Sequence, residues 1–238
     1  MEARCWSRSL QKRAFDVVVS TLALTFTSPI VAVVWVTVRL TSAGPVLFRQ
    51  ERVGLDGKLF TVYKFRTMAV DESGSGPRLT RDGDHRLTRI GKILRKSKVD
   101  EIPQFYNVLR GDMSLVGPRP KLPEYSVASD WHYRPGITGL ATLAFRQEEK
   151  MLKDIPHDDV EEFYQAEIRP LKARLDRWYM RRASIASDLA IIWRTANACL
   201  APDSLREPRI LSRRTAEVAK WVGDRSSIGV ALETESVD

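Results

Sequence analysis

Cysteine and histidine are scarce in this chain of 238 residues, and their scarcity argues against a disulfide framework and against a zinc site. The two cysteines, Cys5 and Cys199, follow neither a metal-binding nor a disulfide pattern. The three histidines, His85, His132 and His157, are scattered without the spacing of metal ligands. We therefore expect no disulfide framework and no zinc site, and this cysteine usage is consistent with a reducing cytosol.

Acidic residues are missing from residues 86–98, although this stretch contains six cations: Arg86, Arg89, Lys92, Arg95, Lys96 and Lys98. The whole chain has a formal net charge of +8, which indicates an anionic partner. Composition alone does not choose among nucleic acid, anionic lipid and phosphorylated substrates. Helix-turn-helix, zinc-finger and RNA-binding aromatic signatures are absent from the sequence, so nucleic acid is not an expected partner.

Charged residues are also missing from residues 17–38, an apolar run of 22 residues that is long enough to cross a bilayer. No small-residue cleavage site follows it, which argues against a secretory signal peptide. Pro29 cannot donate a hydrogen bond to Thr25, so a kink is expected at Ser28-Pro29. Both flanks are basic and would favour the cytoplasmic side. We therefore expect a re-entrant helix that bends at Ser28-Pro29; a single crossing and a buried soluble helix remain alternatives.

Residues 98–120 contain an adjacent acid pair, Asp100 and Glu101, directly after the basic run. Apolar residues then recur at helical spacing, with Ser97 as the expected N-cap, Pro103 in the first turn and Gly111 as the stop. Acids at a helix N-terminus commonly do no more than stabilise the helix dipole. Between clustered cations, however, carboxylates can hold Mg²⁺ and phosphate together, and one of them can act as a nucleophile.

This stretch resembles the signature of the bacterial sugar transferases, the monotopic phosphoglycosyl transferases that start glycan assembly on a polyprenyl phosphate. The resemblance is carried by four ordered blocks: 100–104 (Asp-Glu-Ile-Pro-Gln), 107–108 (Asn-Val), 111–114 (Gly-Asp-Met-Ser) and 117–120 (Gly-Pro-Arg-Pro). It extends over residues 12–195 and implies a re-entrant helix with a Ser-Pro break. It also implies that Asp100 is the nucleophile, with Glu101 as metal ligand or proton-transfer group.

Two β-rich runs, at 44–54 and 60–68, surround Asp56-Gly57 and predict a hairpin. Alternation places Lys64 and Arg66 on one face, either as solvated strand cations or as a pair that contacts phosphate. Residues 71–84 have the composition of a mobile loop. The apolar stripe of residues 87–94, set among cations, suits a helix on anionic lipid, with a calmodulin-type or nucleic-acid-binding segment as the competing interpretation.

The later third contains a Pro/Gly turn at 133–140 that also matches the family, followed by Arg146. The family usually places asparagine after this arginine, whereas this chain has Gln147. Residues 148–167, rich in acids, are expected to form a solvated helical face. Residues 175–193 predict a long amphipathic segment broken near Ser184, suited either to a membrane interface or to core packing. Residues 226–238 are expected to be disordered.

Together these features predict an α+β fold that is predominantly helical with a small β-hairpin, in a monotopic membrane protein. The expected divisions are a re-entrant helix at 12–40, a cytosolic catalytic domain at 41–200 and an extension at 201–238.

The resemblance implies transfer of a sugar-1-phosphate from a nucleotide sugar, most simply a UDP-sugar, to polyprenyl phosphate, with release of UMP, at the cytoplasmic face of the inner membrane. It implies Mg²⁺ at Asp100 and Glu101, and phosphate contacts from Lys64, Arg66, Arg95, Arg119 and Arg146. A non-catalytic membrane scaffold of the same fold is the alternative; the sequence leaves the sugar and any homo-oligomer open.

Overall fold

The computed structural model describes residues 6–69, 84, 86–126, 132–146, 148, 152, 155 and 160–200, and these are mostly helical with one small antiparallel hairpin. The expected helical class is confirmed. The predicted loop at 71–84, apart from Asp84, and the extension at 201–238 lie outside the described residues. The main helices are α1 (Leu10–Thr41), α2 (Arg89–Ser97), α3 (Gln104–Arg110), α4 (Leu140–Ala144), α6 (Val160–Phe163), α7 (Arg169–Arg182) and α8 (Ile185–Leu200).

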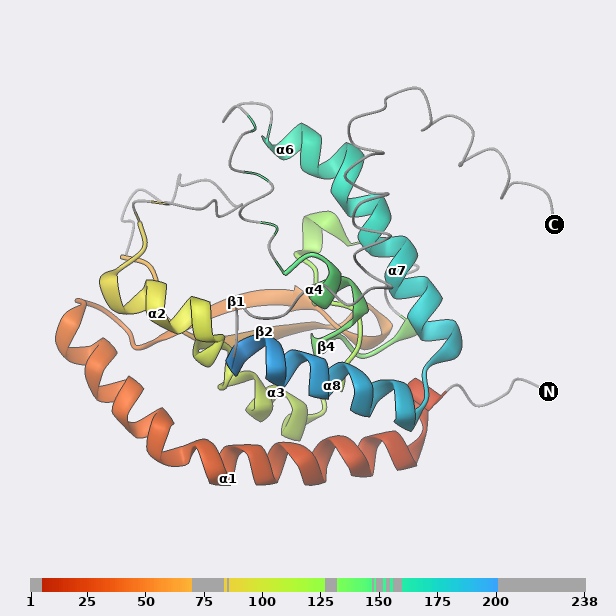
Figure 1. Ribbon diagram of the computed structural model, residues 1–238, viewed down its shortest axis with the longest axis horizontal. Coiled ribbons are helices and arrows are strands. Elements are labelled where there is room, and N and C mark those ends of the chain that lie inside the picture. The colour runs from red at the N-terminus through yellow and green to blue at the C-terminus, as the bar shows by residue number, and fades with distance from the viewer. Residues whose placement is uncertain are drawn as a thin grey trace.

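Helix α1 is the one helix among the described residues that is long and apolar enough to cross a membrane. It begins at the N-cap Ser9 and continues through Pro29, and Figure 1 shows it curved along one side of the molecule. The Thr25 carbonyl, which Pro29 cannot reach with an N–H, accepts a hydrogen bond from the Ser28 hydroxyl at 2.8 Å. Large apolar side chains are exposed along the helix: Val18, Leu22, Phe26, Ile30, Val33, Trp35, Val36 and Leu40.

The predicted hairpin is confirmed, with β1 (Leu47–Val53) antiparallel to β2 (Leu59–Phe65). Its turn contains Asp56 and Gly57, both at positive φ, as the Asp-Gly sequence favours. A second pair, β3 (Ser114–Val116) and β4 (Gly136–Thr138), is parallel and was not foreseen in the sequence. The backbones approach so closely that a Cβ on Gly136 would lie 2.2 Å from the Gly117 nitrogen, so glycine is required there.

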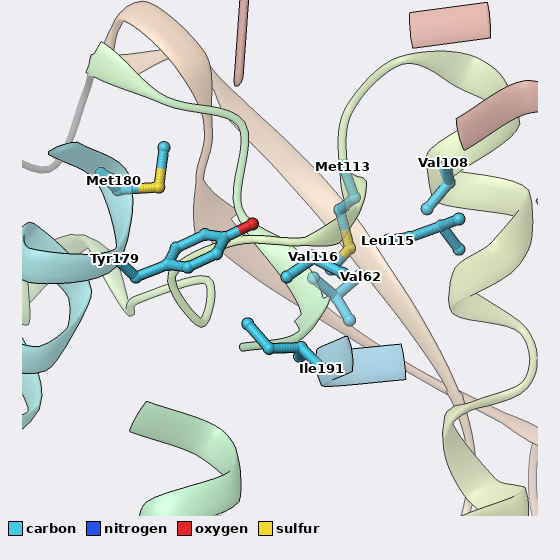
Figure 2. Close-up of a cluster of buried hydrophobic side chains, with 8 residues drawn as sticks. All are labelled: Val62, Val108, Met113, Leu115, Val116, Tyr179, Met180 and Ile191. Carbon is cyan, nitrogen blue, oxygen red and sulfur yellow. The ribbon is translucent and has the colours of Figure 1, made fainter. Parts of the chain in front are cut away.

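Figure 2 shows the main hydrophobic core, where side chains from β2, α3, β3, α7 and α8 converge. Its buried members are Val62, Val108, Met113, Leu115, Val116, Tyr179, Met180 and Ile191. A second cluster joins the C-terminal part of α1 to the hairpin and α2 through Val34, Val38, Phe65 and Leu94. These clusters hold α1, β2 and α3 as neighbours, which determines where the polar side chains between them lie.

The break predicted near Ser184 is confirmed, because α7 ends at Arg182 and α8 begins at Ile185. The apolar side chains of this segment serve two environments. Tyr179 and Ile191 are buried in the core, whereas Trp178 and Trp193 are exposed. Ile185 and Leu189 are also about half exposed, so α8 presents an apolar stripe outside the core.

Candidate active site

The acid pair lies on a short 3₁₀ turn, η3 (Val99–Glu101), between α2 and α3. Lys98 precedes it in the left-handed conformation (φ 57°), which ends α2 and turns the chain. The N-cap prediction for Ser97 was wrong, because Ser97 is the last residue of α2 and its hydroxyl donates to the Ile93 carbonyl. The prediction that Gly111 ends α3 is confirmed: Gly111 adopts φ 91° and caps that helix.

Glu101 is the meeting point of two cations that come from distant parts of the chain. Its Oε1 accepts hydrogen bonds from Lys64 Nζ at 3.0 Å and from Arg119 Nη2 at 2.9 Å. Burial opposes ionisation of this carboxyl, but the charges of Arg119 and Lys64 outweigh it and hold the pKa of Glu101 well below its usual value. Glu101 is therefore an ionised anchor for both cations.

Asp100, the neighbouring acid, is 6% exposed and has no such cation partner among the described residues. Its Oδ1 is buried without a hydrogen bond. Burial and the negative charge of Glu101 raise the pKa of Asp100 to about 6, against the opposing charges of Lys64, Lys98 and Arg95. A buried carboxylate with a free oxygen and a raised pKa is typical of functional sites rather than of structural ion pairs.

Lys64 is positioned because β2 is attached to α3 by a buried amide. Asn107 is fully buried; its Nδ2 donates to the Thr61 carbonyl at 2.7 Å and its Oδ1 accepts from the Tyr63 backbone N–H at 3.2 Å. These two bonds fix the strand immediately before Lys64 against the helix that follows the acid pair. The Asn107-Val108 block of the sequence signature thus has a structural reason.

The remaining predicted cations are distributed around this centre. Arg95 donates to the Thr67 hydroxyl at 3.1 Å, and its charge partly opposes the rise in the pKa of Asp100. Arg146 follows α4, and its charge acts on the thiol of Cys199 in α8, on which the charges of Glu101 and Asp100 also act. Arg66 is directed elsewhere: its guanidinium donates to the Ser42 and Ala43 carbonyls at the end of α1. The guanidinium of Arg66 is thus occupied by these carbonyls, whereas Lys64 binds Glu101.

Sequence reasoning missed a second polar cluster beside Arg119. Lys172 Nζ binds Glu148 Oε2 at 2.5 Å and lies 5.1 Å from the centroid of the Tyr164 ring. Burial and the charge of Glu148 raise the pKa of Tyr164 to about 12, while Arg119 opposes this shift. Glu148 was expected on a solvated face, whereas its side chain is 22% exposed and paired with Lys172. Tyr164 begins a π-helical turn (Tyr164–Ile168), a feature often found at functional sites.

The described residues contain no cluster of three or more His, Cys, Asp or Glu side chains that could hold a metal by themselves. Mg²⁺, however, is commonly bound through one or two carboxylates together with substrate phosphates. The unpartnered Asp100 Oδ1 is an acceptor of the type that Mg²⁺ prefers, and the Glu101 carboxylate is next to it in the chain. The oxygen set therefore fits such an ion.

Comparison with known proteins gives one family. The family model described as bacterial sugar transferase matches residues 7–202. The chain is 35% identical over 198 residues to UDP-N-acetylgalactosamine-undecaprenyl-phosphate N-acetylgalactosaminephosphotransferase of Aeromonas hydrophila, covering 79% of this chain and 43% of that protein. It is 45% identical over 145 residues to UDP-glucose:undecaprenyl-phosphate glucose-1-phosphate transferase of Caulobacter vibrioides, covering 56% of this chain and 54% of that protein.

A third relative matches along almost its entire length. The uncharacterized sugar transferase EpsL of Bacillus subtilis is 38% identical over 222 residues, which cover 91% of this chain and 98% of that protein. The chain thus spans about half of the first two relatives and nearly all of the third. The resemblance based on residues 98–120 is confirmed, and the chain belongs to the bacterial sugar transferase family.

Proposed function

We propose that this protein is a phosphoglycosyl transferase that moves a sugar-1-phosphate from a UDP-sugar to undecaprenyl phosphate. The observation that carries the proposal is the contrast within the acid pair: Glu101 is ionised and bound to Lys64 and Arg119, whereas Asp100 is buried with a free oxygen. The names of the relatives support UDP-sugar and undecaprenyl phosphate as the two substrates.

In the proposed first step, a carboxylate oxygen of Asp100 attacks the β-phosphorus of the UDP-sugar. The bond from that phosphorus to the bridging oxygen breaks, its electron pair leaves with UMP, and the phosphosugar remains on Asp100 as an acyl phosphate. In the second step, a phosphate oxygen of undecaprenyl phosphate attacks the same phosphorus and releases Asp100. Such a covalent route divides one difficult displacement into two easier ones.

The cations around the acids match the charge of this reaction. Lys64 and Arg119 are held by Glu101 before substrate arrives, and the Arg119 side chain is 45% exposed, so a diphosphate can reach it. Positioned cations stabilise charge that develops on phosphoryl oxygens. Asp100 and Glu101 would hold Mg²⁺ when it is bound, and the ion would supply further neutralisation of phosphate charge.

The placement of α1 supports a re-entrant rather than a crossing helix. Near its start, Asp16 accepts a hydrogen bond from the Ser114 hydroxyl at 2.8 Å. Near its end, Val34 and Val38 pack against the hairpin and α2. Both ends therefore contact the same folded body, while Phe26 between them is 78% exposed. In a bilayer this arrangement would immerse the middle of α1 in one leaflet and keep Asp100 and Glu101 at the cytoplasmic interface. The exposed apolar stripe of α8 and the cations of α2 would then lie next to anionic lipid.

The test is UMP release from a panel of UDP-sugars by detergent-solubilised protein with Mg²⁺ and undecaprenyl phosphate. We expect release with at least one donor and its loss in Asp100→Asn, whereas Asp56→Asn, which changes an exposed acid of the hairpin turn, should retain it. Without undecaprenyl phosphate, labelled UMP should still exchange into the UDP-sugar, because the first step needs no lipid. A folded, membrane-bound protein that releases no UMP from any donor would favour the scaffold alternative.

A further inference from the structure

The turn that carries Arg119 has few backbone N–H groups with which to form hydrogen bonds to the rest of the fold. Proline stands on both sides of Arg119, so neither Pro118 nor Pro120 has an N–H with which to bind its surroundings. The turn can be held there through its carbonyls. On the N-terminal side, the Pro118 carbonyl accepts a hydrogen bond from the Gly136 N–H at 2.8 Å.

On the C-terminal side, the hairpin supplies the anchor. Arg52, near the end of β1, donates from Nη1 to the Pro120 carbonyl at 3.1 Å, and its Nη2 is held by the Gln50 side chain. The next residue reinforces this contact, because the Val53 N–H donates to the Lys121 carbonyl at 3.0 Å. Arg119 is thus bracketed by β4 on one side and by Arg52 and Val53 on the other.

Placing a second guanidinium here has an electrostatic cost. Burial and the positive charge of Arg119 lower the pKa of Arg52 to about 10, and Tyr164 only partly offsets this. An arginine retained against a like charge needs a compensating role, and the bond to Pro120 provides one. The same bond determines where the chain continues after Arg119, and hence where that side chain points.

We propose that Arg52 is a positioning residue for Arg119, and through it for the diphosphate of the nucleotide sugar. This inference depends on the proposed function for the identity of the ligand. Arg52 holds the Pro118-Arg119-Pro120 turn so that the Arg119 guanidinium stays next to Glu101, ready to contact phosphate. The proposal assigns this turn to the nucleotide sugar, so loss of Arg52 should weaken binding of the nucleotide sugar and leave binding of the lipid acceptor unaffected.

The test compares Arg52→Met, which removes the hydrogen-bond donor to Pro120, with Arg52→Lys, which retains a charged hydrogen-bond donor. Arg49→Met is the matched control at an exposed position of β1. For Arg52→Met we expect the KM for UDP-sugar to rise about tenfold, as for loss of one hydrogen bond from a charged donor. The KM for undecaprenyl phosphate should stay within about twofold, a change too small to be a lost hydrogen bond. Arg52→Lys should recover most of the donor affinity, and Arg49→Met should resemble the unaltered protein.

A double-mutant cycle separates positioning from an independent effect. If Arg52 acts through Arg119, adding Arg52→Met to Arg119→Ala should raise the donor KM by less than about twofold. Additive losses, or equal losses toward both substrates, would overturn the inference. UDP affinity measured by calorimetry repeats the cycle without turnover. If the UDP affinities of the variants follow this cycle but no UMP is released, the proposed reaction alone is contradicted. If Arg52→Met leaves the UDP affinity unchanged, the positioning role alone is contradicted.

Discussion

Asp100 and Glu101 are adjacent in the chain, yet their surroundings move their pKa values in opposite directions. Burial raises the pKa of Asp100 to about 6, with the charge of Glu101 acting in the same sense. Glu101 is buried too, but its ion pairs with Arg119 and Lys64 hold its pKa far below normal. Two carboxylates with separated pKa values are the usual basis for dividing chemical roles within a pair. In the proposed reaction this division assigns Asp100 as the reactive group and Glu101 as the fixed anion.

The first prediction concerns the pH dependence of turnover. In the proposed reaction Asp100 attacks only when ionised, so kcat/KM for UDP-sugar should fall about tenfold per pH unit below its pKa of about 6, instead of staying level to about pH 4 as for an ordinary aspartate. Lys98 favours the ionised form, so Lys98→Asn should move this acidic limb to higher pH. Lys92→Asn, which alters an exposed cation of α2, is the control. A limb that stays level to about pH 4 would show that Asp100 is not the titrating group.

The second prediction concerns stability. The pKa of Asp100 rises from 3.8 to about 6 on folding, so the folded state binds the proton more tightly and the free energy of unfolding decreases as pH rises through this interval. The full cost, about 3 kcal/mol from a difference of roughly two pH units, is present above about pH 6. Asp100→Asn should therefore abolish turnover yet raise the thermal midpoint at about pH 8, with little change at about pH 4.

The matched control for that measurement is Asp112→Asn. Asp112 forms an ion pair with Arg110 at 3.3 Å, so removing its charge should bring no gain in stability at the same alkaline pH. An Asp100→Asn protein that is less stable there than the unaltered chain would contradict the claim that this carboxylate is held at a cost.

The features that the sequence predicted are those with short-range causes. The hairpin follows from Asp56-Gly57, the end of α3 from Gly111, and the long apolar helix from residues 17–38; each depends on neighbours in the chain. The acid pair was identified by its place after the basic run, and the family signature then implied its role and that of Arg119. The contact of Lys64 and Arg119 with Glu101 Oε1 could not be derived from spacing, because Lys64 lies 37 residues from Glu101 in the chain.

The errors have physical causes as well. Alternation along β2 paired Arg66 with Lys64 as phosphate contacts, but the Arg66 guanidinium donates to the Ser42 and Ala43 carbonyls at the end of α1, which its position in the sequence does not reveal. The charge count placed Glu148 on a solvated face, since its partner Lys172 is distant in sequence. The pairing of β3 with β4 depends on the close contact of Gly117 with Gly136, which three-residue strands do not reveal in advance.

The third prediction tests the amide that positions Lys64. Asn107→Leu keeps the size of the side chain but leaves the Thr61 carbonyl and the Tyr63 N–H without their partner inside the core. We expect a loss of about 2–4 kcal/mol in the free energy of unfolding, as for two buried groups left unsatisfied. Gln104→Met is the control on the same helix, because the Gln104 amide nitrogen is buried without a hydrogen bond and should lose less. Equal losses would indicate that side-chain volume, not the Asn107 bonds, matters here.

The fourth prediction concerns the attachment of α1 to the folded body. Lys12 Nζ lies 2.6 Å from Asp16 and 2.9 Å from Asp188, and all three side chains are at most 3% exposed. Lys12→Met would leave two buried carboxylates without their shared cation, which should cost about 3–5 kcal/mol. Arg8→Met removes a cation from the exposed pair with Asp56 and should cost at most about 1 kcal/mol. Thermal midpoints in detergent compare the two.

The origin of that loss can be separated from a packing defect. Adding Asp188→Asn to Lys12→Met removes one of the unpaired charges, and the amide oxygen introduced there can still accept a hydrogen bond from Trp6 or Tyr179, which both bind Asp188 in the unaltered protein. The double variant should therefore recover part of the lost stability, although Asp188→Asn alone is destabilising. If the two substitutions simply add, the cost lies in the missing lysine stem rather than in unpaired charge. Recovery would instead mean that a buried ionic contact attaches the start of α1 to α8, whereas Val34 and Val38 attach its other end, so that each end of the helix is held to the folded body by a different type of contact.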